Sequence, residues 1–165
     1  RAGTVIRDEY ADGLREIAES TTIPIAAGER LFTRWQFQEL LEKRAVRIVQ
    51  PDLAHAGGIS EVRRIAAMAE SRDVLLAPHC PLSPVALAAS LQVAATCPNF
   101  LIQEHVTLGE TLLMKPFVLE SGYLKVPDGP GLGIELDERK LAAESFDGVW
   151  DNPRFTAEDG GFAEW

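Results

Sequence analysis

Four short apolar runs recur along the first two thirds of the chain, and each is followed by a polar loop. They occupy residues 23–27, 46–49, 74–77 and 100–103. The run at 74–77 is wholly apolar and only four residues long, which predicts a strand buried on both faces of a sheet. Such runs are typical of parallel strands.

The stretches around the runs carry apolar residues at helical spacing, with recognisable start signals. Thr33 and Gln36 have the spacing of a capping box, Ser60 is expected to be an N-cap, and Ser83 followed by Pro84 is the preferred N-cap and N1 pair. The predicted helices cover residues 9–20, 33–44, 60–71 and 84–96. In the third of them, the residues expected to face inward are Val62, Ile65, Ala66 and Ala69.

A polar residue stands just past each run. These residues are Glu29, Asp52, His79 and Glu104, and they are separated by 23, 27 and 25 residues. A strand, a loop, a crossover helix and a return loop need about that many residues, so the spacing predicts a βα repeat and an α/β fold. Four such units make half of an eight-stranded barrel or one side of an open sheet. In a barrel, the four side chains would converge on one mouth.

The pattern changes after Glu104. Residues 116–120 and 122–126 predict a strand and a turn-rich return, and Asp137 is expected to cap a short helix that ends near Glu144. Residues 145–165 read as an extended tail. We expect its aromatic side chains to dock on another surface, because large apolar groups seldom stay exposed without a partner.

Composition narrows the class of protein. The chain has 165 residues, enough for one domain, and a net charge of −9 without a Lys/Arg-rich run, which argues against a nucleic-acid partner. No apolar stretch is long enough for a membrane span, and no signal peptide is recognisable at the start. Cys80 and Cys97 form no CxxC pair, so we expect reduced thiols and a cytoplasmic protein.

Each candidate residue also has an ordinary structural reading. Glu29 could be a ligand of a hard cation, or it could pair with Arg30 or Arg34. Asp52 could cap a turn, or it could orient the His79 imidazole and raise its basicity. A histidine such as His79, taken alone, is more often a satisfied core residue. The even spacing of the four positions favours a functional role for the four residues taken together.

Two further histidines are weaker candidates. His55 lies in a His-Ala-Gly-Gly loop and is interpreted as a loop residue rather than a second polar group at the mouth. His105 follows Glu104 directly, and it would point away from Glu104 if the strand continues.

Five short motifs, taken together and in order, resemble the second half of the enolase superfamily barrel. More narrowly they resemble the mandelate racemase subgroup and, within it, the D-galactonate dehydratases. The motifs are Gly28-Glu29-Arg30, Gln50-Pro51-Asp52, His55-Ala56-Gly57-Gly58, Ala77-Pro78-His79-Cys80-Pro81 and Gln103-Glu104. The resemblance implies a (β/α)₇β barrel with a separate capping domain. Residues 1–115 would form the C-terminal half of the barrel, and residues 116–165 a hairpin, short helix and tail associated with the cap.

The resemblance also implies roles for the four residues. Glu29 would be the last of three carboxylates that bind Mg²⁺, and Asp52 would support His79 as the acid/base. Glu104, in its protonated form, would donate a hydrogen bond to the substrate carboxylate. This chemistry is that of a hydro-lyase that removes the proton α to a carboxylate and eliminates water, giving a 2-keto-3-deoxy sugar acid. Enzymes of this superfamily combine a Lys or His base with Mg²⁺.

Alternatives to a dehydratase remain. The same residues could serve a racemase or epimerase of a 2-hydroxy acid, or the chain could be an inactive half-barrel that acts as a structural or binding module. The first four strands, two metal ligands and the opposing base implied by the resemblance are not in these 165 residues, so activity is expected only for the complete chain. The implied partners are a small sugar-acid substrate and further copies of the protein in a homo-oligomer.

Overall fold

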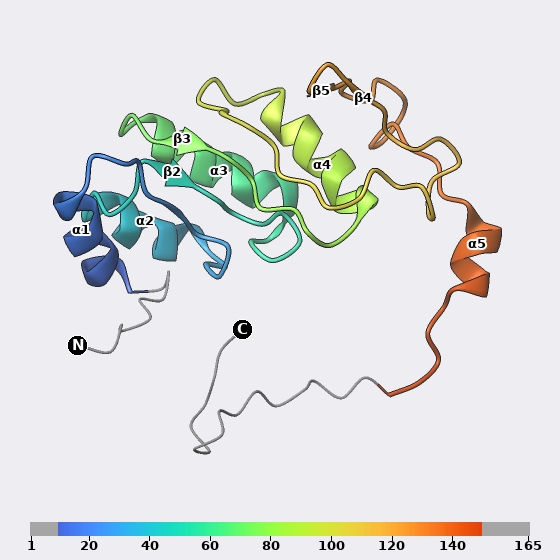
Figure 1. Cartoon of the computed structure of the whole chain (residues 1–165), viewed down its shortest axis with the longest axis horizontal. Coiled ribbons are helices and arrows are strands. Elements are labelled where there is room, and N and C mark those ends of the chain that lie inside the picture. The colour runs from blue at the N-terminus through green and yellow to red at the C-terminus, as the bar shows by residue number, and fades with distance from the viewer. Residues whose placement is uncertain (1–9, 150–165) are drawn as a thin grey trace.

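The computed structural model describes residues 10–149, which consist of three β–α units followed by a longer and more open segment (Figure 1). Short strands alternate with helices of about two to four turns in the first part. The elements in chain order are α1 (Ala11–Ser20), β1 (Ala26–Ala27), α2 (Arg34–Glu42), β2 (Ile48–Val49), α3 (Gly58–Glu70), β3 (Leu75–Leu76), α4 (Pro84–Ala94), β4 (Leu119–Glu120), β5 (Tyr123–Leu124) and α5 (Glu138–Ala143).

The strands β1, β2 and β3 form one parallel sheet in sequence order. Ala26 pairs with Ile48, and Ile48 pairs with Leu75. Parallel neighbours need a crossover connection, which α2 provides between β1 and β2 and α3 between β2 and β3. Along the row, α2 packs against α3 and α3 against α4. The predicted βα repeat is confirmed, and the three strands therefore end at the same edge of the sheet.

One face of this sheet is buried and the other is open. Ala27, Val49 and Leu76 point to the buried face, whereas Ala26 and Leu75 are exposed, Leu75 at 40%. The prediction that the strand at 74–77 is buried on both faces is therefore wrong for this chain. The reason is that the helices within residues 10–149 cover a single face. No second layer lies against the other face in this part of the chain.

The core lies between the buried face of the sheet and the helices. Phe37 and Leu40 of α2 meet Ile65 of α3, and all three are at most 1% exposed. The predicted inward face of α3 is confirmed, since its buried residues are Val62, Ile65, Ala66 and Ala69. Burying a side chain of this size is worth about 1.5–3 kcal/mol. An exposed ion pair contributes about 0–1 kcal/mol, so packing dominates the stability of this region.

Two of the three predicted helix starts are confirmed. The Gln36 side-chain oxygen accepts from the backbone N–H of Thr33 at 3.1 Å, and Ser83 Oγ accepts from the Ala86 N–H at 3.1 Å. Ser60, however, is not an N-cap. The third helix begins two residues earlier, after Gly57, whose φ of 93° lies in the left-handed region that glycine tolerates. This turn leads straight into the helix.

The fourth apolar run is only partly a strand. A single parallel bridge joins Phe100 to Leu76, flanked by the hydrogen bonds Leu76 N–H to Asn99 O (2.9 Å) and Leu101 N–H to Leu76 O (2.8 Å). The Asn99 side chain also donates to the carbonyls of Ala66 and Val74. The run lies beside β3 as predicted, but it is joined to β3 by one bridge rather than by a continuous ladder, and the Asn99 side chain adds a bond to Val74.

The segment after Glu104 forms the predicted hairpin and short helix. β4 and β5 pair antiparallel, and Asp137 caps α5 by accepting from the Lys140 N–H at 3.1 Å. Leu108, Phe117 and Leu124 of this segment pack against a small buried cluster of Cys80, Leu87 and Leu91. The tail aromatics Trp150, Phe155, Phe162 and Trp165 lie outside the described residues. Within residues 10–149, no helix is long and apolar enough to cross a membrane.

Candidate active site

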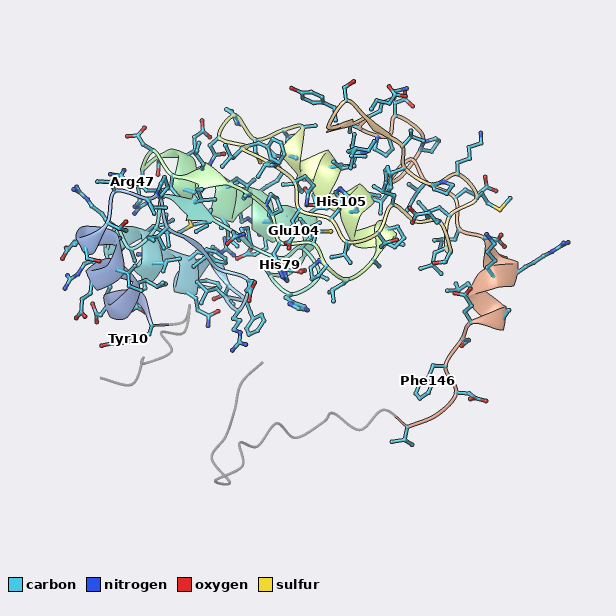
Figure 2. The ribbon with its side chains drawn as sticks, viewed as in Figure 1. Tyr10, Arg47, His79, Glu104, His105 and Phe146 are labelled. Carbon is cyan, nitrogen blue, oxygen red and sulfur yellow. The ribbon has the colours of Figure 1, made fainter. Side chains whose placement is uncertain are left out.

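The predicted site residues follow the carboxyl ends of neighbouring strands. Glu29 comes two residues after β1, Asp52 three after β2 and His79 three after β3, while Glu104 follows the run beside β3. Because the strands are parallel, their ends meet at one edge, where α/β proteins hold their ligands. Figure 2 shows His79 and Glu104 near each other in the middle of the molecule, far from Phe146 beyond α5.

Asp52 and His79 form the best-defined contact of the site. His79 Nδ1 lies 2.9 Å from Asp52 Oδ2, and Asp52 is 1% exposed. The other carboxylate oxygen, Oδ1, accepts from the N–H groups of Ala54 at 2.7 Å and His55 at 3.3 Å. Three hydrogen bonds thus compensate the burial of this carboxylate.

This contact selects the tautomer of His79. A carboxylate can only accept a hydrogen bond, so we assign the ring hydrogen to Nδ1. Nε2 carries the lone pair in the neutral ring, and in the protonated ring its N–H faces Glu29 Oε2, which lies 3.4 Å away. The imidazole can therefore accept a proton at Nε2, and Asp52 stabilises the cation that results.

Glu29 reaches this position through a glycine. Gly28 has a φ of 130°, and a Cβ built on it would lie 2.6 Å from the Phe37 ring. The chain can therefore turn past α2 only with glycine at this position. The Glu29 side chain is half exposed. Of its two expected ordinary partners, Arg34 forms an ion pair with Glu61 at 3.0 Å instead.

Glu104 is hydrogen-bonded to the loop that carries His79. Its Oε2 accepts from the backbone N–H of Cys80 at 3.0 Å. Burial, and then the charges of Asp52 and Glu104, raise the pKa of the Cys80 thiol to about 11. That thiol is accordingly neutral at pH 7, which excludes it as a thiolate nucleophile there.

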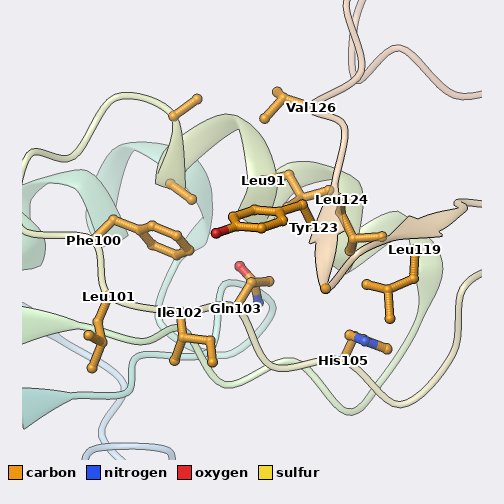
Figure 3. Close-up of a pocket in the computed structure, with 13 residues that line it drawn as sticks. Leu91, Phe100, Leu101, Ile102, Gln103, His105, Leu119, Tyr123, Leu124 and Val126 are labelled. Atoms are coloured by element: carbon orange, nitrogen blue, oxygen red, sulfur yellow. The ribbon is translucent and has the colours of Figure 1, made fainter.

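The other two histidines lie apart from this group. His55 is exposed, and its ring meets Phe32 edge-on with centroids 6.1 Å apart, in keeping with its interpretation as a loop residue. His105 lines a separate cavity of about 590 Å³ between α4, the fourth run and the β4–β5 hairpin. Figure 3 shows His105 on one side of this apolar cavity, near Leu119, with Tyr123 reaching across it.

Glu29 is the candidate metal ligand on this chain. A half-exposed carboxylate oxygen suits a hard cation such as Mg²⁺. Within residues 10–149, no three His, Cys, Asp or Glu side chains come together as a metal site. The donor set thus fits one ligand of a shared site, and the described residues do not complete a coordination sphere.

Ser90 is a buried residue near the site that the sequence patterns did not single out. It is 1% exposed, and its hydroxyl donates to Gln103 Oε1 at 2.7 Å. A hydroxyl on the nearly all-apolar face of the helix at 84–96 needs a buried partner, and that requirement is the signal that could have found it.

The chain is similar to known proteins by a family model and by sequence identity to curated relatives. The model of the family described as "Enolase C-terminal domain-like" matches residues 5–140. The chain is 45% identical to a D-galactonate dehydratase of Variovorax paradoxus (strain S110) and 46% identical to one of Ralstonia pickettii (strain 12J). Each alignment covers 95% of this chain and 44% of the relative. The chain therefore spans a little under half the length of these curated relatives.

Solved structures are similar as well. An enolase from Agrobacterium radiobacter, with bound sodium and L-malate, superimposes with a TM-score of 0.84 at 30% identity, covering 95% of this chain and 44% of that one. A mandelate racemase/muconate lactonizing enzyme from Jannaschia sp. CCS1 gives a TM-score of 0.80 at 37% identity, covering 88% and 38%. These proteins carry the same arrangement of strands and helices.

Proposed function

The chain belongs to the enolase C-terminal domain-like family, and from that premise we propose that it is the C-terminal barrel half of a Mg²⁺-dependent acid-sugar dehydratase. Its substrate would be a sugar acid of the galactonate type, the substrate in the names of its curated relatives. The observation that carries the proposal is the 2.9 Å contact between His79 and Asp52, which leaves Nε2 as a proton-transfer atom at the open edge of the sheet.

The proposed roles of Glu29 and Glu104 come from the resemblance to the enolase superfamily, and the geometry is compatible with them. Glu29 would hold Mg²⁺ together with ligands from outside the described residues. When bound, Mg²⁺ would stabilise the negative charge that develops on the substrate carboxylate as the α-proton leaves. Glu104 has Oε2 occupied by the Cys80 N–H, so Oε1 would face the substrate and, in its acid form, donate a hydrogen bond to that carboxylate.

His79 would act in the elimination step. After a base from elsewhere in the complete protein has taken the α-proton, the C3–O bond breaks and the departing hydroxyl takes the proton of the His79 imidazolium at Nε2. Water leaves, and the resulting enol becomes the 2-keto-3-deoxy acid. Asp52 would hold the ring in position and stabilise the imidazolium before the transfer.

The test is turnover by the native polypeptide with Mg²⁺ on a panel of aldonic and aldaric acids. Release of a 2-keto-3-deoxy product, detected by a semicarbazide or thiobarbiturate assay, is expected with at least one acid and is abolished by EDTA. A full panel without product would exclude the dehydratase. Native mass spectrometry of the same sample measures the polypeptide length. About twice the present mass would remove the half-barrel alternative, in which these residues act alone as a binding module.

A racemase or epimerase of a 2-hydroxy acid is the second candidate. The position of Nε2 supports it, because the same atom, in the neutral imidazole, could take the α-proton of the substrate directly. Exchange of the α-hydrogen with D₂O, followed by NMR and unaccompanied by loss of water, would select this reaction over the dehydratase.

The setting of the enzyme is also part of the proposal. Reduced Cys80 and Cys97 suit a cytoplasmic enzyme, and residues 1–115 and 116–165 would divide between barrel and cap-associated segment. A homo-oligomer is expected, and light scattering of the native protein would measure its size.

A further inference from the structure

The position of Glu104 relative to His79 is not set by a strand ladder. Beyond the Leu76–Phe100 bridge, the backbone of the fourth run makes its last bond to β3 at Leu101, three residues before Glu104. His79 likewise lies three residues beyond the end of β3. Two groups that must act on one substrate therefore sit on adjoining loop ends, where the sheet alone leaves them some freedom.

The Gln103 side chain joins these two ends. Its Nε2 donates to the Pro78 carbonyl at 3.2 Å and to the Glu104 carbonyl at 2.8 Å. Pro78 directly precedes His79, so one amide nitrogen holds the backbone next to both residues. The ends of β3 and of the fourth run are thereby joined by a side chain.

Ser90 on α4 is the third hydrogen-bond partner of that amide. Its buried hydroxyl donates to Gln103 Oε1 at 2.7 Å. The two carbonyls of Pro78 and Glu104 can only accept, so the NH₂ group must face them and the oxygen must face Ser90. The amide then donates to both carbonyls and accepts from the hydroxyl, whereas the alternative flip would place its oxygen against two carbonyl acceptors and leave two mismatched pairs.

We propose that Gln103, held by a hydrogen bond from Ser90, is a positioning residue that sets the spacing between His79 and Glu104. Its catalytic consequence rests on the proposed function, whereas its structural consequence does not. Without the amide, the Glu104 carboxylate would leave the Cys80 N–H and sample positions away from the substrate. Misplacement of a catalytic group by about 1 Å can cost on the order of 10²-fold in rate.

Gln103→Met removes all three side-chain hydrogen bonds at nearly constant size, and Gln103→Glu removes only the two that the amide donates. Gln92→Met is the matched control, because Gln92 lies on the same α4 helix as Ser90 and its Nε2 donates to the Pro127 carbonyl at 2.7 Å, outside the site. In the native protein with Mg²⁺ and its best acid, both Gln103 variants are expected to lose roughly 10- to 100-fold in kcat with KM within about twofold. Gln92→Met is expected to keep kcat.

A crystal structure of Gln103→Met supplies a readout independent of turnover. The distance from Cys80 N to the Glu104 carboxylate, 3.0 Å here, is expected to exceed hydrogen-bond range. Retention of that contact, or an unchanged kcat, overturns the proposal. So does an equal loss in Gln92→Met, since the effect would then be general destabilisation.

If the wild-type protein turns over none of the acids but Gln103→Met still displaces Glu104, the dehydratase fails and the positioning role stands. If the Gln103 variants do not fold, Ser90→Ala and Ser90→Thr replace them. The alanine variant should lose kcat and the threonine variant should restore most of it, and equal activity of the two would overturn the proposal.

Discussion

The β–α units from Ala11 to Ala94 and the segment from His105 to Val149 bury their apolar side chains to different extents. In the units, almost every apolar side chain on the inner side of a helix is buried, whereas α5 buries none and Phe146 and Val149 are largely exposed. Three of the four candidate site residues, Glu29, Asp52 and His79, lie in the first region, and Glu104 follows it. Proton transfer needs groups held within a few tenths of an ångström, and only a packed core provides that restraint.

The largest expected effect comes from removing proton transfer without disturbing the packed region. His79→Asn keeps a side chain that can hydrogen-bond Asp52 but cannot transfer a proton, so kcat of the complete enzyme should fall on the order of 10²- to 10⁴-fold. Steady-state kinetics with Mg²⁺ measure it. The control His55→Asn changes an exposed histidine of the preceding loop and should stay within a few-fold of wild type; comparable losses in both would contradict the assignment.

The two regions can be compared directly by the same truncation in each. Phe37→Ala, at a ring that is fully buried, should lower the free energy of unfolding by about 3–5 kcal/mol. Phe146→Ala, at a ring that is 68% exposed, should change it by no more than about 0.5 kcal/mol. Urea denaturation of the native protein compares them. Equal effects would show that the C-terminal segment is packed as tightly as the units.

Alkaline pH should lower the free energy of unfolding, because the buried Cys80 thiol ionises less readily in the folded protein than in the unfolded one. Its pKa is raised to about 11 in the folded protein, mainly by burial, against 9.0 unperturbed, so the unfolded state loses this proton first. Stability from the neutral thiol is therefore complete below pH ~9 and is lost between about pH 9 and 11, by up to about 2 kcal/mol.

The matched comparison is Cys80→Ala against Cys97→Ala, both measured by denaturation as a function of pH. Cys80→Ala should flatten the alkaline decline. Cys97 is only partly buried, so its removal should have the smaller effect. A decline that persists unchanged in Cys80→Ala would assign it to other groups.

The smallest expected difference concerns two helix caps. Ser83→Ala removes the bond from Ala86 N–H at the start of α4 and should cost about 1 kcal/mol, because α4 belongs to the cooperative core. Asp137→Ala removes the equivalent bond at α5, a helix without buried residues, and should fray α5 with little change in global stability. Hydrogen exchange followed by mass spectrometry separates the two. A global effect of Asp137→Ala would place α5 within the cooperative unit.

Much of the fold could be predicted from local patterns. Alternating apolar runs and amphipathic stretches predicted the order of strands and helices, and the spacing of Glu29, Asp52, His79 and Glu104 predicted that they follow strand ends. The pairs Thr33/Gln36 and Ser83/Pro84 marked helix starts correctly, because capping depends on residues only three positions apart. The prediction at Ser60 was wrong, since a glycine in the left-handed conformation can start a helix without a side-chain cap.

Contacts between residues far apart in the sequence could not be predicted from these local patterns. The exposure of Leu75, the diversion of Arg34 to Glu61, and the joining of Pro78, Ser90 and Glu104 through Gln103 all depend on which segments lie side by side. Sequence periodicity describes how a residue is placed relative to its near neighbours in the chain, and it contains no information about distances across the sheet. The types of residue at the strand ends are therefore a property of the amino-acid order, while their separations and hydrogen-bond partners come from the packing of the chain on itself.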